Sequence, residues 1–123
     1  MKVTVLGDGA WGTALALHLL DTGHDVILWG AFPDYVETMR KTRENREYMP
    51  GITLPQTLRI ESDMKTAAAS AELFVMAIPT QYLRNALKGL GAPPYAEDAL
   101  FVNVAKGLEY ESRKRPSQIV SDV

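Results

Sequence analysis

The sequence predicts an α/β fold of the doubly wound class, in which helices cover both faces of a parallel sheet. Short apolar, β-branched runs alternate with segments of helical periodicity along nearly the whole chain, without repeats or low-complexity linkers. Crossovers between parallel strands are right-handed, so five strands joined in this way favour the spatial order 3-2-1-4-5. A glycine-rich turn directly after the first strand supports the same fold class.

The first half of the chain contains two expected strand–helix units. Residues 2–6 form a β-branched run that stops at glycine, as a buried strand does. Residues 13–20 carry apolar side chains at helical spacing, and the segment ends in a turn at Gly23. The second strand is expected over residues 25–29. Pro33 suits the first turn of a helix that we expect to run to about Asn45.

The second half continues the alternation after a long connection. Turn-forming residues between Tyr48 and Pro55 predict a loop. Strands are then expected over residues 58–60, 73–78 and 100–104. Helices are expected between and after them, over residues 63–69, 81–87 and 118–123. Either Ser62 or Asp63 is expected to cap the first of these helices.

The composition excludes several classes of protein. With 46% hydrophobic and 23% charged residues in 123 positions, the chain is expected to fold as one domain over residues 1–123. The net charge of −2 gives no electrostatic reason to expect nucleic acid as a partner, and no apolar stretch at the N-terminus is long enough to span a membrane. The lack of cysteine fits a reducing cytoplasm, and the two histidines lack the spacing of a metal site.

The three glycines of a G-x-G-x-x-G motif, Gly7, Gly9 and Gly12, stand between the first strand and its helix. That context is typical of a Rossmann-type dinucleotide-binding fold. Gly7 permits the tight turn, Gly9 leaves room for a pyrophosphate, and Gly12 lets helix and strand pack closely. The helix N-terminus then offers free N–H groups and a partial positive charge to the phosphates. A glycine-rich turn without a ligand is the alternative, and the context favours dinucleotide binding.

The end of the second strand lacks the acidic residue that holds the adenosine ribose in many such folds. Trp29, Gly30, Ala31 and Phe32 occupy that place, and the next carboxylate, Asp34, is expected to belong to the start of the following helix. For Phe32 two interpretations stay open: the ring lies against the adenine, or it covers the core.

Four stretches of the sequence, residues 7–16, 45–55, 77–80 and 105–109, carry a more specific signal. Trp11 inside the glycine loop, followed by Asn-Arg-x-Tyr-x-Pro-Gly from Asn45, is much more specific than the glycines alone. In order and spacing these stretches resemble the N-terminal, cofactor-binding half of bacterial NAD(P)-dependent glycerol-3-phosphate dehydrogenase.

The resemblance implies that the complete protein reduces dihydroxyacetone phosphate to sn-glycerol 3-phosphate with NAD or NADP, for phospholipid synthesis. In that family a second, helical domain supplies the catalytic lysine and most substrate contacts. The resemblance implies that residues 1–123 lie before that domain and before the last strand of the nucleotide-binding sheet. We therefore expect the chain to hold the cofactor, to contain no catalytic residue and to be inactive alone.

The resemblance also assigns individual residues. It places Ala10 and Trp11 against the pyrophosphate, Tyr48 in a loop beside the cofactor, and Pro79 at the end of the fourth strand. Lys106 follows the fifth strand, where it would face the nicotinamide and bind the substrate; a solvated lysine at a strand exit is the alternative. Ala31 stands where the family often has an arginine for the 2′-phosphate of NADPH, and no carboxylate is expected to repel that phosphate.

Two further expectations concern the chain as a whole. A non-catalytic Rossmann module that senses nucleotides is the alternative function, and the length of 123 residues favours it. The edge of the fifth strand is expected to invite pairing between chains, so a homodimer is one outcome.

Overall fold

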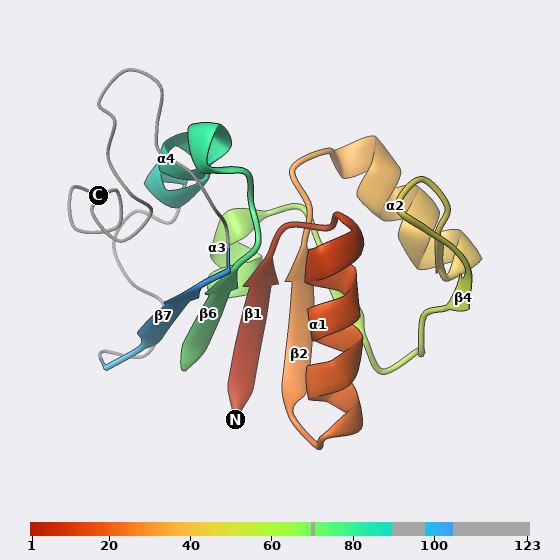
Figure 1. The fold of residues 1–123 in the computed structure, drawn as a ribbon, viewed down its shortest axis with the longest axis horizontal. Coiled ribbons are helices and arrows are strands. Elements are labelled where there is room, and N and C mark those ends of the chain that lie inside the picture. The colour runs from red at the N-terminus through yellow and green to blue at the C-terminus, as the bar shows by residue number, and fades with distance from the viewer. Residues whose placement is uncertain (70, 90–97, 105–123) are drawn as a thin grey trace.

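In the computed structural model the described residues are 1–69, 71–89 and 98–104, without the side chains of residues 80 and 81. A parallel sheet has the strand order β5-β2-β1-β6-β7, and all four neighbouring pairs are parallel. Counted along the chain, this is the predicted order 3-2-1-4-5, which is therefore confirmed (Figure 1). The strands are β5 (Arg59–Glu61), β2 (Asp25–Trp29), β1 (Lys2–Leu6), β6 (Leu73–Met76) and β7 (Leu100–Asn103).

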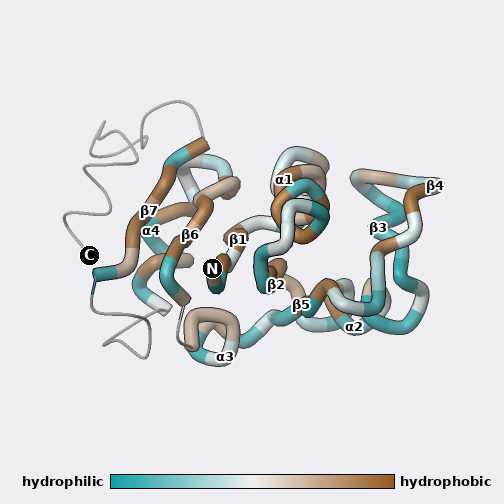
Figure 2. Tube along the Cα trace, turned by 90° about the horizontal axis from the view of Figure 1, so that it is seen from below, coloured by the Kyte–Doolittle hydropathy of each residue, from teal (hydrophilic) through white to brown (hydrophobic). Residues whose placement is uncertain are grey.

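Each face of the sheet has its own hydrophobic core, because successive side chains of a strand point to opposite faces. From β1, Val3 and Val5 enter one core while Leu6 enters the other. The first core is completed by two helices, α1 (Ala10–Asp21) and α2 (Pro33–Thr42), and the second by α3 (Met64–Ala68) and α4 (Thr80–Lys88). Figure 2 shows α1 and α3 on opposite faces. Helices on both faces are what near-continuous apolar strands require.

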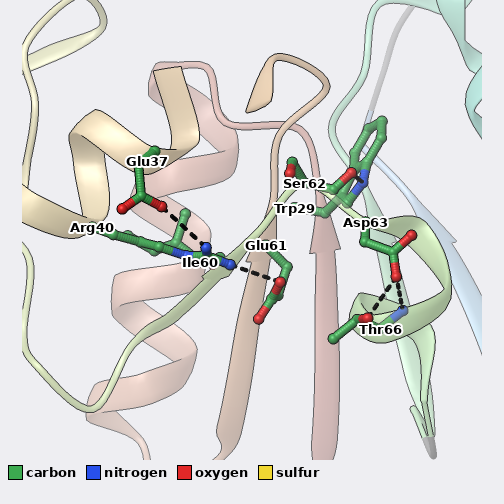
Figure 3. A network of polar contacts seen from close by, with 8 residues as sticks. All are labelled: Trp29, Glu37, Arg40, Ile60, Glu61, Ser62, Asp63 and Thr66. Atoms are coloured by element: carbon green, nitrogen blue, oxygen red, sulfur yellow. Dashed lines mark hydrogen bonds and ion pairs between the residues drawn. The ribbon is translucent and has the colours of Figure 1, made fainter. Parts of the chain in front are cut away.

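Two expected helix starts are confirmed. Pro33 occupies the first turn of α2, where its missing N–H removes no helical hydrogen bond. Asp63 caps α3: its Oδ2 accepts a hydrogen bond from the Thr66 N–H at 3.1 Å (Figure 3). The cap satisfies one N–H at the start of a helix that is too short to be stable without such contacts.

The helix that begins at Pro33 is shorter than predicted, because it ends at Thr42 rather than near Asn45. Arg43 adopts a left-handed backbone conformation with φ of 54°, and its N–H donates to the Met39 carbonyl at 2.8 Å. Its guanidinium donates to the Leu58 carbonyl at 3.0 Å. The backbone bond and the side-chain bond together hold a left-handed turn that glycine usually makes.

The segment predicted as a loop between Tyr48 and Pro55 instead contains a strand. In this segment β4 (Met49–Thr53) pairs antiparallel with β3 (Glu44–Asn45). The Glu44 carboxylate accepts the Gly51 N–H at 3.1 Å and so ties the two strands across the turn. The hairpin turns at residues 46–48, so Pro50 and Gly51 lie within β4 rather than in a loop.

Arg40 joins α2 to the outer edge of the sheet (Figure 3). Its Nε donates to the Ile60 carbonyl at 2.6 Å, and its Nη2 lies 2.7 Å from the Glu61 carboxylate. Close to this network, the Trp29 indole N–H donates to the Ser62 carbonyl at 3.0 Å. That bond fixes the orientation of a buried ring at the end of β2.

The candidate dinucleotide site

A cavity of about 780 Å³ opens where β1, β2 and β6 end. In Figure 1 these carboxyl ends form the upper edge of the sheet, and the loop from β1 to α1 runs along it. Open α/β sheets bind ligands at this edge, at the point where the strand order reverses. The described residues that line the cavity are Gly7, Asp8, Gly9, Ala10, Trp11, Gly12, Trp29, Ala31, Phe32, Tyr48, Met64, Ala77, Ile78, Pro79, Tyr82, Asn85, Ala86 and Gly89.

Two glycines of the loop let β1 and α1 pack closely, as predicted, and also bring the loop against the end of β6. Gly7 has φ of +119°, and a Cβ there would lie 2.6 Å from the Ala77 carbonyl oxygen. A Cβ on Gly12 would lie only 2.0 Å from the Gly7 carbonyl oxygen. Backbone atoms cannot move aside as a flexible side chain can, so neither position accepts a larger residue. The turn brings the start of α1 against the sheet.

The third glycine, Gly9, serves a different purpose. It caps α1 with φ of −70°, a conformation open to any residue, and no atom lies within 4 Å of where its Cβ would be. The first helical bond runs from the Thr13 N–H to the Gly9 carbonyl at 3.0 Å. The N–H groups that precede Thr13 in the first turn of α1 have no acceptor within the helix. No acidic residue stands in that turn. Open space beside unpaired amides fits a pyrophosphate.

Exposed aromatic rings surround the cavity. Trp11, Phe32, Tyr48 and Tyr82 are 59%, 71%, 48% and 61% exposed. The exposure of Phe32 shows that the core-covering alternative is wrong and leaves its ring free to lie against a base. Tyr82 on α4 was not predicted, because a single tyrosine on an amphipathic helix carries no signal of its own. These flat apolar faces suit the planar rings of a dinucleotide.

Asn45 fastens the glycine loop to the hairpin and to α2, and sequence reasoning missed this role. The side chain is fully buried, and its Nδ2 donates to the Asp8 carbonyl at 2.7 Å and to the Thr13 hydroxyl at 2.9 Å. Its Oδ1 accepts from the Tyr35 hydroxyl, which itself accepts the Glu47 N–H at 3.1 Å. One amide thus joins three segments of the chain behind the cavity.

Asp8 carries the only carboxyl group among the described residues that line the cavity, and none of them has a cationic side chain. Its Oδ2 is buried without a hydrogen-bond partner in the described structure. Burial raises the pKa of the Asp8 carboxyl, and the charge of Glu47 raises it further, whereas a bond to its own backbone N–H lowers it. The residues that follow β2 carry no acid before Asp34, as the sequence shows, but the Asp8 carboxyl reaches the end of β2 from the neighbouring loop.

The structure brings together the predicted cofactor residues that it describes. Gly7, Gly9, Ala10, Trp11, Gly12, Ala31, Phe32, Tyr48 and Pro79 all line the cavity, and their roles in binding stay predictions. Lys106 and the helix expected over residues 118–123 lie outside the described residues. Within the described ranges there is no cluster of three or more residues suited to hold a metal ion. No helix in the same ranges has the length and apolar character needed to cross a membrane.

Comparison with known proteins gives consistent relatives. A family model described as the NAD-dependent glycerol-3-phosphate dehydrogenase N-terminus matches residues 2–123. The chain is 46% identical to a glycerol-3-phosphate dehydrogenase [NAD(P)+] of Syntrophomonas wolfei, over 99% of this chain and 35% of the relative. It is 39% identical to the Bacillus subtilis enzyme of the same name, over 97% of this chain and 34% of the relative.

A solved structure extends the likeness to three dimensions. The crystal structure of glycerol-3-phosphate dehydrogenase from Coxiella burnetii superposes with a TM-score of 0.88 at 27% identity. The match covers 98% of this chain and 37% of that one. The chain thus spans about a third of the length of the relatives that it matches.

Proposed function

Because this chain belongs to the NAD-dependent glycerol-3-phosphate dehydrogenase N-terminus family, we propose that it binds NAD(H) in the cavity at the ends of β1, β2 and β6. In the complete protein it would serve an enzyme that interconverts dihydroxyacetone phosphate and sn-glycerol 3-phosphate. The observation that carries the proposal is the cradle at Gly9, where open space meets the unpaired amides of α1.

The residues around the cradle suggest how a dinucleotide would be held. The pyrophosphate would accept hydrogen bonds from the N–H groups of Ala10 and Trp11 at the start of α1. The adenosine would extend past Ala31, with its base against the exposed ring of Phe32. The nicotinamide would lie on the other side, towards Pro79 at the end of β6. When bound, the nicotinamide supplies the hydride that is exchanged with the substrate.

Lys106 would complete the site on the substrate side. It follows β7 in the sequence, and the carboxyl ends of neighbouring parallel strands meet at one edge of a sheet. A lysine there can act as a point charge for a phosphate or for a polarised carbonyl oxygen. At that edge Lys106 would contact both the nicotinamide of the cofactor and the substrate.

The variant Gly9→Val tests the proposal. Its backbone angles are open to any residue and a Cβ there meets no atom within 4 Å, so folding should persist, while the branched side chain enters the cradle. We expect calorimetric titration to show NADH affinity at least about a hundredfold weaker, because several charge-assisted bonds to the pyrophosphate are lost together. Gly9→Ala should give a smaller loss.

The matched control is Thr22→Val, which places the same side chain at the opposite, exposed end of α1. Its NADH affinity should equal that of the unsubstituted chain, and circular dichroism should show both variants folded. If folded Gly9→Val kept full affinity for NADH, the glycine loop would not be the phosphate cradle and the proposal would fail.

A further inference from the structure

The carboxyl group of Asp8 lies against the end of β2, although the residue belongs to the loop after β1. A Cβ built on Gly30 would come within 2.3 Å of Asp8 Oδ2 and 2.8 Å of its carboxyl carbon. A side chain at position 30 would displace the carboxyl from this place. Gly30 and Asp8 are therefore sterically coupled, which the linear sequence does not reveal.

Many dinucleotide-binding sheets carry an acidic residue at the place that this carboxyl occupies. An acidic residue at the end of the second strand commonly accepts hydrogen bonds from the adenosine ribose. In this chain Gly30 and Ala31 stand at that position and supply no acceptor side chain. The nearest later acid, Asp34, is exposed in the first turn of α2 and does not line the cavity.

The described part of the cavity offers the Asp8 carboxyl no opposite charge. No cationic side chain lines the described part of the cavity, so the Asp8 carboxylate meets no neutralising partner there. Its Oδ2 is buried without a hydrogen bond, and burial strengthens the interaction of a charge with its neighbours. Tyr35 from α2 and Glu47 from the hairpin are the titratable groups coupled to it, and neither brings positive charge.

We propose that Asp8 determines cofactor specificity, by replacing the missing acid at the end of β2 and selecting a dinucleotide with a free ribose 2′-hydroxyl over its 2′-phosphorylated counterpart. A hydroxyl can donate to a carboxylate, whereas a 2′-phosphate has only negative oxygens to offer and is repelled. The inference rests on the proposed function, because it requires that the cavity binds a dinucleotide.

Calorimetric titrations with NADH and NADPH at one fixed low salt concentration and about pH 8 test this role, since at that pH an Asp carboxyl is normally ionised. The unsubstituted chain should bind NADH more tightly than NADPH by about tenfold or more, because like charges a few ångströms apart repel strongly outside bulk water. Asp8→Asn, which keeps the shape and removes the charge, should reduce that ratio by about tenfold.

Asp34→Asn is the matched control, because it removes the same charge from an exposed position on the first turn of α2. It should leave the ratio of the two affinities unchanged. Asp8→Ala repeats the test if Asp8→Asn does not fold, since alanine is small enough to leave the space beside Gly30 open.

The outcomes separate this inference from the proposed function. If the unsubstituted chain binds NADH but prefers NADPH, or if neither Asp8 variant changes the ratio, the inference is wrong and the proposed function stands. If the chain binds neither dinucleotide, the proposed function fails and the inference fails with it. An equal change in Asp34→Asn would contradict the role of Asp8 by showing that overall charge sets the preference.

Discussion

Removing the buried amide of Asn45 should destabilise the chain more than any other single polar deletion near the cavity. Asn45→Ala eliminates two donated bonds, at 2.7 and 2.9 Å, and the bond accepted from the Tyr35 hydroxyl. Each such bond contributes about 1 kcal/mol net. The Asp8 carbonyl keeps a bond from the Thr13 hydroxyl at 3.3 Å, which moderates the loss. We expect the free energy of unfolding to fall by about 2 to 3 kcal/mol.

Urea denaturation at neutral pH, followed by circular dichroism, measures this change through the midpoint at constant slope. Tyr35→Phe removes one of the three bonds and also the bond that the hydroxyl accepts from the Glu47 N–H, so it should lower the free energy of unfolding by about 1 to 2 kcal/mol. The double variant should lose less than the sum, because both substitutions remove the same bond.

Asn85→Ala is the control for the loss of an amide as such. Asn85 lies exposed on α4, so its replacement should change the free energy of unfolding by less than about 0.5 kcal/mol. If Asn45→Ala destabilised the chain no more than Asn85→Ala, the buried amide would not be what joins the glycine loop to the hairpin and α2.

Three further outcomes are expected. Ala31→Arg should shift the ratio of NADH to NADPH affinity towards NADPH by roughly ten- to a hundredfold in calorimetry, since a guanidinium can pair with the 2′-phosphate; an unchanged ratio would place the adenosine elsewhere. Because burial raises the pKa of Asp8 in the folded chain, ionisation of that carboxyl costs folding free energy at neutral pH. Asp8→Asn should therefore raise the urea midpoint at neutral pH, and the gain should vanish once the pH falls below the ordinary carboxyl pKa; a gain independent of pH would point to packing instead. In a complete dehydrogenase that carries this chain, Lys106→Ala should lower kcat/KM by a factor that corresponds to a loss of roughly 2–4 kcal/mol of transition-state stabilisation. A normal kcat/KM would show that Lys106 is a solvated lysine without a role in the reaction.

The sheet could be predicted from the sequence because its signals are local. The run Val3–Leu6 and the glycine motif each specify their own conformation, and the handedness of the crossovers then fixes the strand order. For the same reason, the cavity at the ends of the central strands followed from the motif and its context. The hairpin was missed because part of what joins its strands is a side-chain contact, the bond from the Gly51 N–H to the carboxylate of Glu44 seven residues earlier.

Asp8 and Asn45 could not be predicted as site residues, for a different reason. Asp8 stands inside a glycine motif, where the intervening residue is not part of the pattern, and it meets Gly30 only after β1 and β2 have paired. Asn45 was expected at the end of a helix, and it becomes a buried partner of the loop only because Arg43 turns the chain. Contacts of this kind join segments that are far apart in the sequence, so they form only once the chain has folded and local sequence patterns do not reveal them.

The bond from Arg40 to the Ile60 carbonyl has a consequence for how one chain meets another (Figure 3). On β5 the Glu61 carbonyl accepts the Gly30 N–H on the side of β2, so the carbonyl one residue earlier faces the outer edge. A free acceptor there would be a template for a strand from a neighbouring molecule. The guanidinium already occupies it, and a charged side chain lies across the path of approach. A strand that added to this edge would first have to displace the Arg40 guanidinium from the Ile60 carbonyl.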